Sequence, residues 1–355
     1  HVLCASALVA CSADSGVSAT RSAATGTSVP TTDTTVGSAP TDSTPSTTSL
    51  PFNDETIPDD PDVRIVTLDN GLTVYLRHNE RPGAHAELRL VINAGSAVEE
   101  PDQAGVAHFL EHMLFNGTAK YPANELIATL RTFGMDLGAD INAYTSYDET
   151  VYQLSVPLSD PDNLATGIDV LAEWLSAATL SVDEVTKERG VVLDEWRQRD
   201  QSLDGRIGDT ITNMFLGGTA YDGRQPIGGD AAINAMTPDL LRRFYDRWYR
   251  PDNAAIVVVG DIDVSETEET IRERLGGIAS RGGDGPPSNA PLTAYSSPVA
   301  LVLADPDEID AALELTLPTP AGRPQGSVGA SQQELLLGLA FEMISTRFRD
   351  DIARG

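Results

Sequence analysis

Two histidines and a glutamate, spaced closely, are the residues of this sequence most suited to chemistry. His108, Glu111 and His112 form the pattern His-x-x-Glu-His in the run AHFLEHMLF. On an α-helix, residues four apart lie one above the other, so both imidazoles would share a face and could bind one Zn²⁺. The carboxylate of Glu111 could reach the same face and accept a proton from a metal-bound water. A histidine pair on an apolar helix can also be structural, and the pattern alone leaves that alternative open.

A catalytic zinc site needs a third protein ligand, and the sequence offers two glutamates for this role. Glu188 and Glu195 lie seven residues apart in KERGVVLDEW. On a helix they would share a face at a separation of about 10 Å. One carboxylate could bind a metal while the other holds a metal ligand in place. The alternative is an ordinary solvated helix face, which is common in so acidic a protein.

The elements that must position these groups can be predicted from the apolar pattern. Helical periodicity at residues 105–115 predicts a helix around the histidines, and a capping box of Ser181 and Glu184 predicts a long helix running past Trp196. Strands and helices mix without strict βαβ alternation, so the predicted fold class is α+β. Strands are predicted at residues 63–68, 72–77, 86–93, 141–145, 150–156, 254–259, 299–303 and 311–317, and further helices at 124–133, 163–178, 237–248, 265–275 and 331–352.

The composition sets limits on class and partners. The chain has 355 residues, of which 41% are hydrophobic and 22% charged, as in folded globular proteins. Its formal net charge of −29 argues against a nucleic acid as partner, because a phosphate backbone would be repelled. Beyond the N-terminal segment, no run approaches the roughly 18 consecutive apolar residues of a membrane-spanning helix. The sequence therefore predicts a globular protein with no nucleic-acid partner.

The N-terminal residues resemble the end of a bacterial lipoprotein signal. Residues 2–10 are small or apolar, and the run LVAC resembles a lipobox, which predicts lipidation of Cys11. A chance cysteine after small apolar residues is the alternative. Residues 12–58 are rich in Ser, Thr and Pro and are expected to form a disordered tether. The other cysteine, Cys4, also precedes this tether, so no disulfide is expected in the folded part.

Four runs of the sequence, taken in order, resemble the pitrilysin/insulinase family of zinc metallopeptidases, and most of all its bacterial cell-envelope members. The runs are GVAHFLEHMLFNGT, NAYTSYDETVYQLSVP, KERGVVLDEW and RQPIGGDAAINAMTPDLLRRFYDRWYRPDNAAIVVVGDID. The resemblance implies a mixed, mainly antiparallel sheet packed with helices, as in the mitochondrial-processing-peptidase-like fold. It implies that His108, His112 and Glu195 bind one Zn²⁺ per chain. It further implies that Glu111 is the catalytic base and that Glu188 assists catalysis without binding the metal.

The resemblance also implies a substrate site and a function. Residues Asn142, Ala143 and Tyr144 match a strand whose exposed edge pairs with the substrate backbone in the family; a turn-capping role for Asn142 is the alternative. The implied function is a metalloendopeptidase that hydrolyses peptides or unfolded polypeptide segments at the bacterial cell envelope, on the periplasmic or extracellular face. One alternative is a catalytically inactive member that serves as a scaffold or binding subunit. Another is a solute-binding or adhesion lipoprotein with a structural histidine pair.

The expected organisation of the chain follows from these features. The family has two similar halves that close around a chamber, so the second half of the same full-length chain or a homologous subunit is an expected partner. A lipid anchor is the only expected contact with a membrane. The expected domains are a signal remnant with the lipobox (1–11), the tether (12–58), a catalytic zinc-binding domain (59–280), a Gly/Pro/Ser-rich linker (281–298) and the start of a truncated second homologous domain (299–355).

Overall fold

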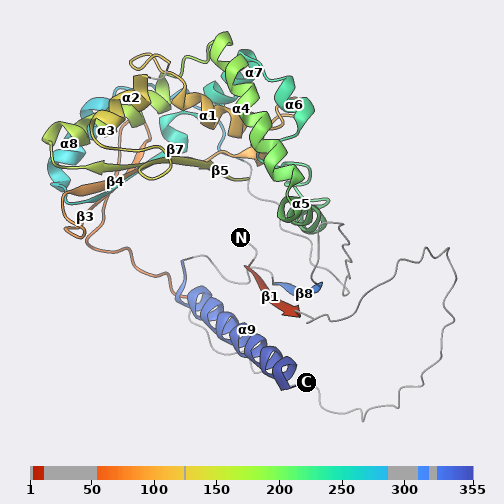
Figure 1. Ribbon diagram of the computed structural model, residues 1–355. Coiled ribbons are helices and arrows are strands. Elements are labelled where there is room, and N and C mark those ends of the chain that lie inside the picture. The colour runs from red at the N-terminus through yellow and green to blue at the C-terminus, as the bar shows by residue number, and fades with distance from the viewer. Residues whose placement is uncertain (1–2, 12–53, 124, 287–310, 320–325, 355) are drawn as a thin grey trace. The chain divides into compact units, whose positions relative to one another are not determined.

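A computed structural model describes residues 3–11, 54–123, 125–286, 311–319 and 326–354 (Figure 1). The chain divides into two compact units, one of residues 59–295 and the other of residues 1–58 together with 296–355. Most of the predicted tether, the linker beyond residue 286 and the predicted strand at 299–303 lie outside the described residues. The predicted catalytic, metal-binding and substrate-binding residues all belong to the larger unit, and Cys11 belongs to the smaller one.

The larger unit is built on a six-stranded sheet with the strand order β2-β3-β7-β4-β6-β5. Neighbouring strands are antiparallel except β3 and β7, which run parallel. This mixed, mainly antiparallel sheet confirms the predicted fold class. The strands are β2 (Arg64–Thr67), β3 (Thr73–His78), β4 (His85–Ile92), β5 (Ile141–Thr145), β6 (Thr150–Pro157) and β7 (Ala254–Gly260).

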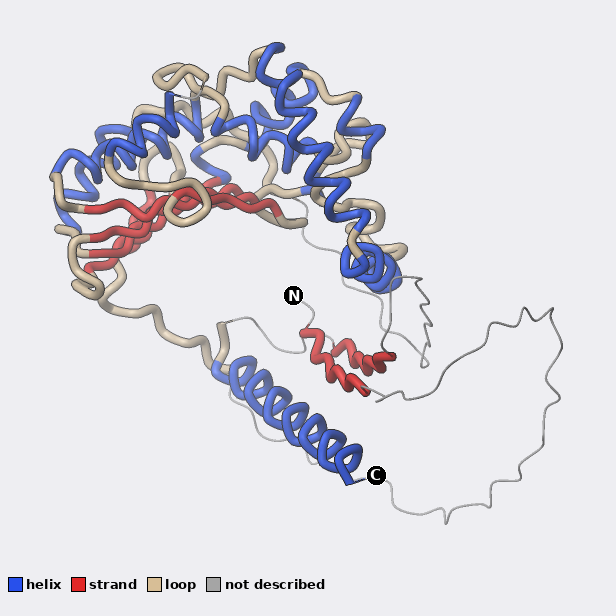
Figure 2. Tube along the Cα trace, viewed as in Figure 1, coloured by secondary structure: helices blue, strands red, loops and turns tan. Residues whose placement is uncertain are grey.

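Helices cover one face of this sheet. Figure 1 shows α1, α2, α3 and α8 on the same side of the strands, and Figure 2 shows the two layers by colour. In β4, Ala86, Leu88 and Leu90 are buried while Glu87 and Arg89 between them are exposed, the alternation expected when one face of a strand is covered. The helices are α1 (Val106–Phe115), α2 (Glu125–Thr132), α3 (Pro161–Ser176), α4 (Val182–Gln201), α5 (Leu203–Leu216), α6 (Asp230–Asn234), α7 (Pro238–Trp248) and α8 (Val264–Leu275), with 3₁₀ turns η1 (Ser96–Val98) and η2 (Pro251–Asn253).

Three of these helices differ from the sequence prediction. Helix α3 begins two residues before the predicted start, because Asp160 caps it and Pro161 occupies its first turn. Helices α5 and α6 were not predicted at all. Two glycines, Gly205 and Gly208, weaken the helical pattern of α5. The side chain of Ser202 nevertheless caps α5 by accepting a hydrogen bond from the Gly205 backbone N–H.

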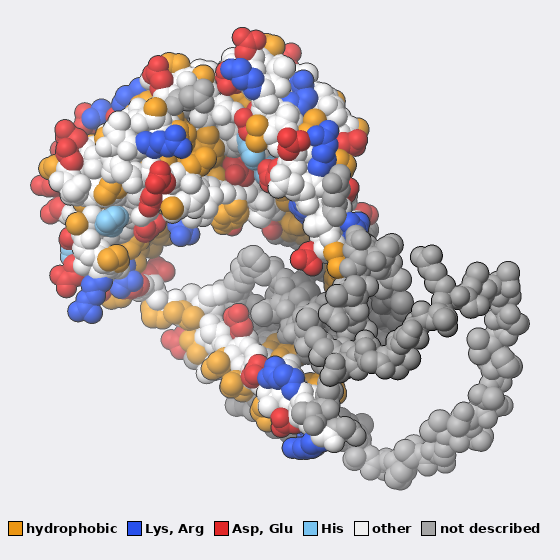
Figure 3. Space-filling view, in the orientation of Figure 1, with side chains coloured by type: hydrophobic (Ala, Val, Ile, Leu, Met, Phe, Trp, Pro, Cys, Tyr) orange, Lys and Arg blue, Asp and Glu red, His pale blue; other side chains and the backbone are white. Residues whose placement is uncertain are grey.

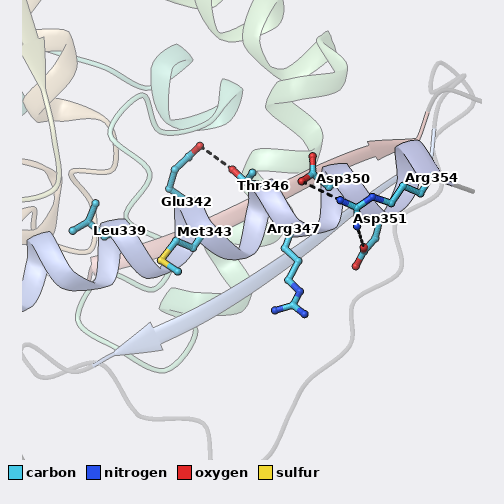
Figure 4. A pocket seen from close by; sticks show the side chains of 8 residues that line it. All are labelled: Leu339, Glu342, Met343, Thr346, Arg347, Asp350, Asp351 and Arg354. Carbon is cyan, nitrogen blue, oxygen red and sulfur yellow. Dashed lines mark hydrogen bonds and ion pairs between the residues drawn. The ribbon is translucent and has the colours of Figure 1, made fainter.

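The smaller unit contains β1 (Leu3–Cys11), which pairs antiparallel with β8 (Ala311–Thr319), and the long helix α9 (Val328–Arg354). Strand β8 and helix α9 match the elements predicted at 311–317 and 331–352. Strand β1 comprises residues that the sequence assigns to a signal remnant, and its lipidation stays a prediction. A hollow of about 550 Å³ runs along α9 (Figure 4), and its lining side chains, among them Leu339 and Met343, all come from this one helix.

The described surface is strongly mixed in charge. On the face seen in Figure 3, basic side chains occur in small separate groups among acidic ones. Among the described helices, none is both long enough and apolar enough to cross a bilayer.

Candidate metal centre

Helix α1 carries the His-x-x-Glu-His motif at the border of the hydrophobic core. Phe109, Leu110 and Met113 are buried in the core, whereas His108 and His112 are only partly covered. The two rings therefore lie on the edge of the buried face, with centroids 4.7 Å apart in an edge-to-face arrangement. The helical spacing predicted from the sequence thus brings the two imidazoles into edge-to-face contact on one side of the helix.

The N-terminus of α1 is capped by a buried carboxylate from outside the helix. Glu99 accepts hydrogen bonds from the backbone N–H groups of Gly105 (3.0 Å) and Ala107 (2.9 Å). The Arg224 guanidinium donates to the Glu99 carbonyl at 2.6 Å. Burial raises the pKa of Glu99 to about 8, even though these N–H groups and Arg224 favour the charged form. Glu99 thereby fixes the start of the helix that carries the motif.

Helix α4 brings the third candidate ligand to the two histidines. Nε2 of His108 lies 3.5 Å from one carboxylate oxygen of Glu195, and Nε2 of His112 lies 3.3 Å from the other. One ligand atom from each of the three residues lies within 4.8 Å of the others. The two imidazoles, by hydrogen bonding, hold the pKa of Glu195 well below its usual range. The three residues predicted as metal ligands are therefore brought together.

This donor set fits zinc in type and in spacing. Two imidazole nitrogens and one carboxylate form the His₂Glu set of catalytic zinc sites, which leaves a fourth position for water or substrate. Bonds of about 2.0–2.1 Å in a tetrahedron place neighbouring ligand atoms about 3.3–3.4 Å apart. Each oxygen of Glu195 lies near this distance from one histidine nitrogen, 3.5 Å for His108 and 3.3 Å for His112, and one ligand atom from each of the three residues lies within 4.8 Å of the others. The residues present therefore fit Zn²⁺ in donor type and in approximate spacing.

Glu188 lies on the opposite side of the His112 ring from Glu195. Its Oε1 is 2.9 Å from Nδ1 of His112, and its other oxygen accepts a hydrogen bond from the Asn116 amide, just after α1. The two glutamates, seven residues apart, thus lie on either side of the His112 ring, with Glu188 at Nδ1 and Glu195 at Nε2. Burial shifts the pKa of both Glu188 and His112 toward the neutral form. The hydrogen bonds nevertheless lower the pKa of Glu188, and those to Glu188 and Glu195 raise the pKa of His112 to about 10.

His108, the other histidine of the motif, has no carboxylate at its Nδ1 atom among the described residues. Nδ1 of His108 is buried and makes no hydrogen bond within the described residues. A ligand histidine is usually oriented by a hydrogen bond at its other nitrogen. Among the described residues that bond exists for His112 and not for His108.

Glu111 is the most deeply buried polar group of the motif. Only 7% of the residue is exposed, and its Oε2 accepts a hydrogen bond of 2.6 Å from the Thr145 hydroxyl. It comes from the same helix as the two histidines but is not among the three converging ligands. A carboxylate so placed is suited to exchanging a proton with a nearby water.

The predicted substrate residues lie on the strand beside α1. Asn142, Ala143 and Tyr144 belong to β5, which is the last strand of the sheet and pairs on its inner side with β6. On the outer side, Ile141 forms a single bridge with Leu137, and no other described strand pairs there. Asn142 and Tyr144 are exposed. The edge beyond Ile141 therefore has no neighbouring strand among the described residues, and the Ala143 N–H donates to Oδ1 of Asn142 at 2.9 Å.

Three contributors to the site were not predicted from the sequence. Glu99, Asn116 and Thr145 each act through a hydrogen bond to a residue of the centre or to the helix that carries it. Asn116 and Thr145 lie inside the runs FNGT and NAYTSY, so their place beside the motif was visible although their partners were not. Glu99 has no comparable signal.

A helix-borne His-x-x-Glu-His motif with a distant glutamate, set over a mixed sheet, defines a metallopeptidase class. Comparison with known proteins agrees. The profile of the family described as Insulinase (Peptidase family M16) matches residues 74–222, and that of the Peptidase M16 inactive domain matches residues 235–349. The chain belongs to the M16, or insulinase, family of peptidases.

Individual relatives support the same assignment. The chain is 43% identical over 216 residues to the probable zinc protease PqqL of Escherichia coli K12, which covers 60% of this chain and 23% of that protein. An uncharacterized zinc protease of Mycobacterium leprae is 31% identical over 257 residues, or 72% of this chain and 55% of that protein. The chain thus spans about a quarter of one relative and about half of the other.

Solved structures show the same fold. The crystal structure of the first half of the periplasmic protease PqqL from E. coli matches with a TM-score of 0.62 and 40% identity, over 65% of this chain and 50% of that one. Pitrilysin matches with a TM-score of 0.56 at 21% identity, over 69% of this chain and 26% of that one, which supports the fold alone.

Proposed function

We propose that this chain carries the catalytic centre of a zinc-dependent endopeptidase that cleaves peptides or unfolded polypeptide segments at the bacterial cell envelope. The observation that carries the proposal is the convergence of His108, His112 and Glu195, with the buried carboxylate of Glu111 on the same helix. A scaffold or binding protein would not need this combination of a complete ligand set and a base.

Each group of the centre has a distinct role in the proposed reaction. Bound Zn²⁺ would polarise the scissile carbonyl and lower the pKa of its water. Glu111 accepts the water proton and later delivers it to the leaving amine. Glu188 fixes the tautomer and the orientation of His112 through its hydrogen bond at Nδ1. Glu188 is hydrogen-bonded to Nδ1 of His112, on the side of the ring away from the proposed metal-binding atom Nε2. Its contribution to turnover is therefore indirect.

The form of β5 supports an extended substrate. A peptide that adds to a free strand edge must itself be extended, and its backbone supplies the hydrogen bonds. Asn142, Ala143 and Tyr144 would contribute these contacts beside the metal centre. A folded protein could not present such a strand, so peptides and unfolded segments are the proposed substrates.

The proposed location rests on the relatives and on the N-terminal sequence. The E. coli relative is described as periplasmic, and the LVAC run ending at Cys11 would add a lipid anchor as the only attachment to the membrane. The proposed partner, besides substrate, is the second half of the same full-length chain or a homologous subunit that closes the substrate chamber.

The decisive test separates metal binding from proton transfer in the intact protein. Glu111→Gln keeps the side-chain size and the zinc ligands, so about one zinc per chain should remain while peptide hydrolysis falls on the order of 10²- to 10⁴-fold. His112→Ala should lose both zinc and activity. Metal analysis and a fluorogenic peptide assay, with and without chelator, measure these effects. Near wild-type turnover in Glu111→Gln would exclude Glu111 as the base, and zinc without any hydrolysis in the wild type would favour a scaffold.

A further inference from the structure

The hydrogen bond between Thr145 and Glu111 joins two parts of the site that the proposed mechanism treats separately. Thr145 Oγ1 lies 2.6 Å from Oε2 of Glu111, a short distance within the range of charge-assisted O–H···O⁻ bonds. An ionised carboxylate only accepts hydrogen bonds, so the threonine hydroxyl is the donor. Within the described residues, Oε1 of Glu111 makes no hydrogen bond. One oxygen of the carboxylate is thus held while the other is left for exchange with water.

The sheet fixes the direction of the Thr145 side chain. Thr145 is the last residue of β5 and pairs with Thr150 of β6. Since side chains alternate along a strand, Ile141, Ala143 and Thr145 face one side of the sheet, and they are more buried than Asn142 and Tyr144 between them. Helix α1 packs against this strand. A β-branched side chain has few χ1 rotamers, so the hydroxyl is delivered to Glu111 with little freedom.

We propose that Thr145 is a positioning residue that orients Glu111 for proton transfer, so that the strand edge that receives substrate also sets the direction of the base. The proposal rests on the role of Glu111 proposed above. It links the two functions because Asn142, Ala143 and Tyr144, the proposed substrate contacts, are the residues immediately before Thr145 on a five-residue strand. A substrate strand added to β5 would hold Thr145 in register, and with it the carboxylate.

A merely structural role makes a different prediction. If the hydroxyl served only to satisfy a buried carboxylate, its removal would lower the thermal stability of the protein and leave turnover per folded, zinc-loaded molecule unchanged. If it orients the base, turnover falls while substrate binding and zinc content stay constant. The two roles therefore separate in kcat and in the dependence of the kcat effect on Glu111.

The experiment uses the intact, zinc-loaded protein and five variants. Thr145→Val removes the hydroxyl at nearly constant volume, and Thr145→Ser keeps it. Glu111→Gln and the double variant with Thr145→Val complete a double-mutant cycle. The matched control is Thr73→Val, which changes a threonine of β3, near the opposite edge of the sheet from β5. Zinc content, melting temperature, kcat and KM are measured for each on one fluorogenic peptide.

Thr145→Val should lower kcat by roughly 10- to 100-fold, the value of a hydrogen bond to a charged group, with KM within about twofold and zinc unchanged. Thr145→Ser should restore most of kcat, and Thr73→Val should equal the wild type. In the Glu111→Gln background, Thr145→Val should have almost no further effect.

Three results would overturn the inference: wild-type kcat in Thr145→Val, a Thr145→Ser variant as impaired as Thr145→Val, or an equal loss in the Glu111→Gln background. Full activity in Glu111→Gln would instead remove the proposed base, and the role of Thr145 with it. The failure of the inference alone is thus distinguishable from the failure of the proposed function.

Discussion

Replacing Glu99 by glutamine should change how the stability of the protein depends on pH. Glu99 is 4% exposed, and its carboxylate caps the helix that carries the metal ligands. Burial raises the pKa of Glu99 to about 8 from its ordinary value of 4.5. Between these values the folded protein keeps a proton that the unfolded chain releases. The stabilising contribution of this group is therefore complete below pH 4.5 and is lost as the pH rises through 8.

The size of the effect follows from the same two values. One bound proton corresponds to at most about 1.4 kcal/mol of unfolding free energy for each pH unit. Between pH 5.5 and 7.5, both inside the window, the wild type should lose about 2–3 kcal/mol from this group. Glu99→Gln keeps one of the two acceptor oxygens for the helix N–H groups, which lowers stability by an amount that does not depend on pH, and its amide does not titrate. The stability of this variant should therefore decline less over the same interval.

Urea unfolding at several pH values, followed by tryptophan fluorescence, measures the difference. Other titrating groups, including His112, are common to both proteins and cancel when the variant is subtracted from the wild type at equal zinc content. The difference curve should slope in one direction from pH 5.5 to 7.5. A flat difference curve would show that Glu99 titrates at the same pH in the folded and unfolded chain, and the argument from burial would be wrong.

Two further predictions concern the ligand set and the anchor. Glu195→Gln should abolish stable zinc binding, because it removes the only anionic ligand, whereas Glu188→Gln should keep zinc with an affinity lowered roughly 10- to 100-fold; metal titration against a chelator ranks the two, and the reverse order would exchange their roles. Cys11→Ala should move the full-length protein from the membrane to the soluble fraction of bacterial cells, and an unchanged distribution in fractionation would contradict lipidation.

Much of the centre could be predicted because its information is local. The spacing of His108 and His112 fixes their common face on a helix, and the two-turn spacing of Glu188 and Glu195 fixes theirs. The capping interaction of Ser181 with the Glu184 backbone N–H is also a local feature and occurs as predicted. What the spacing could not supply was the role of each glutamate, which required the resemblance to a known family.

The rest of the site depends on contacts between distant segments. Thr145 is 34 residues from Glu111, and Asn116 is 72 residues from Glu188. No periodicity specifies such pairs, because they arise only when the sheet and helices pack. The parallel pairing of β3 with β7 is of the same kind, since it joins strands separated by most of the larger unit. Helix α5 was missed for a local reason, because its two glycines weaken the helical pattern of its sequence, while the Ser202 cap supports the helix in the structure.

The position of β5 at the end of the sheet also bears on self-association. Proteins commonly protect an edge strand with proline, a bulge or an inward charge, since unpaired N–H and C=O groups can recruit another chain. An edge that admits substrate backbone, as proposed for β5, cannot be closed in these ways. What limits unwanted pairing here is length, because five residues span only about 17 Å. In the proposed mode of binding, the short strand would give an extended peptide enough backbone to align beside the candidate metal centre. It gives a second copy of the protein little surface on which to begin a fibril.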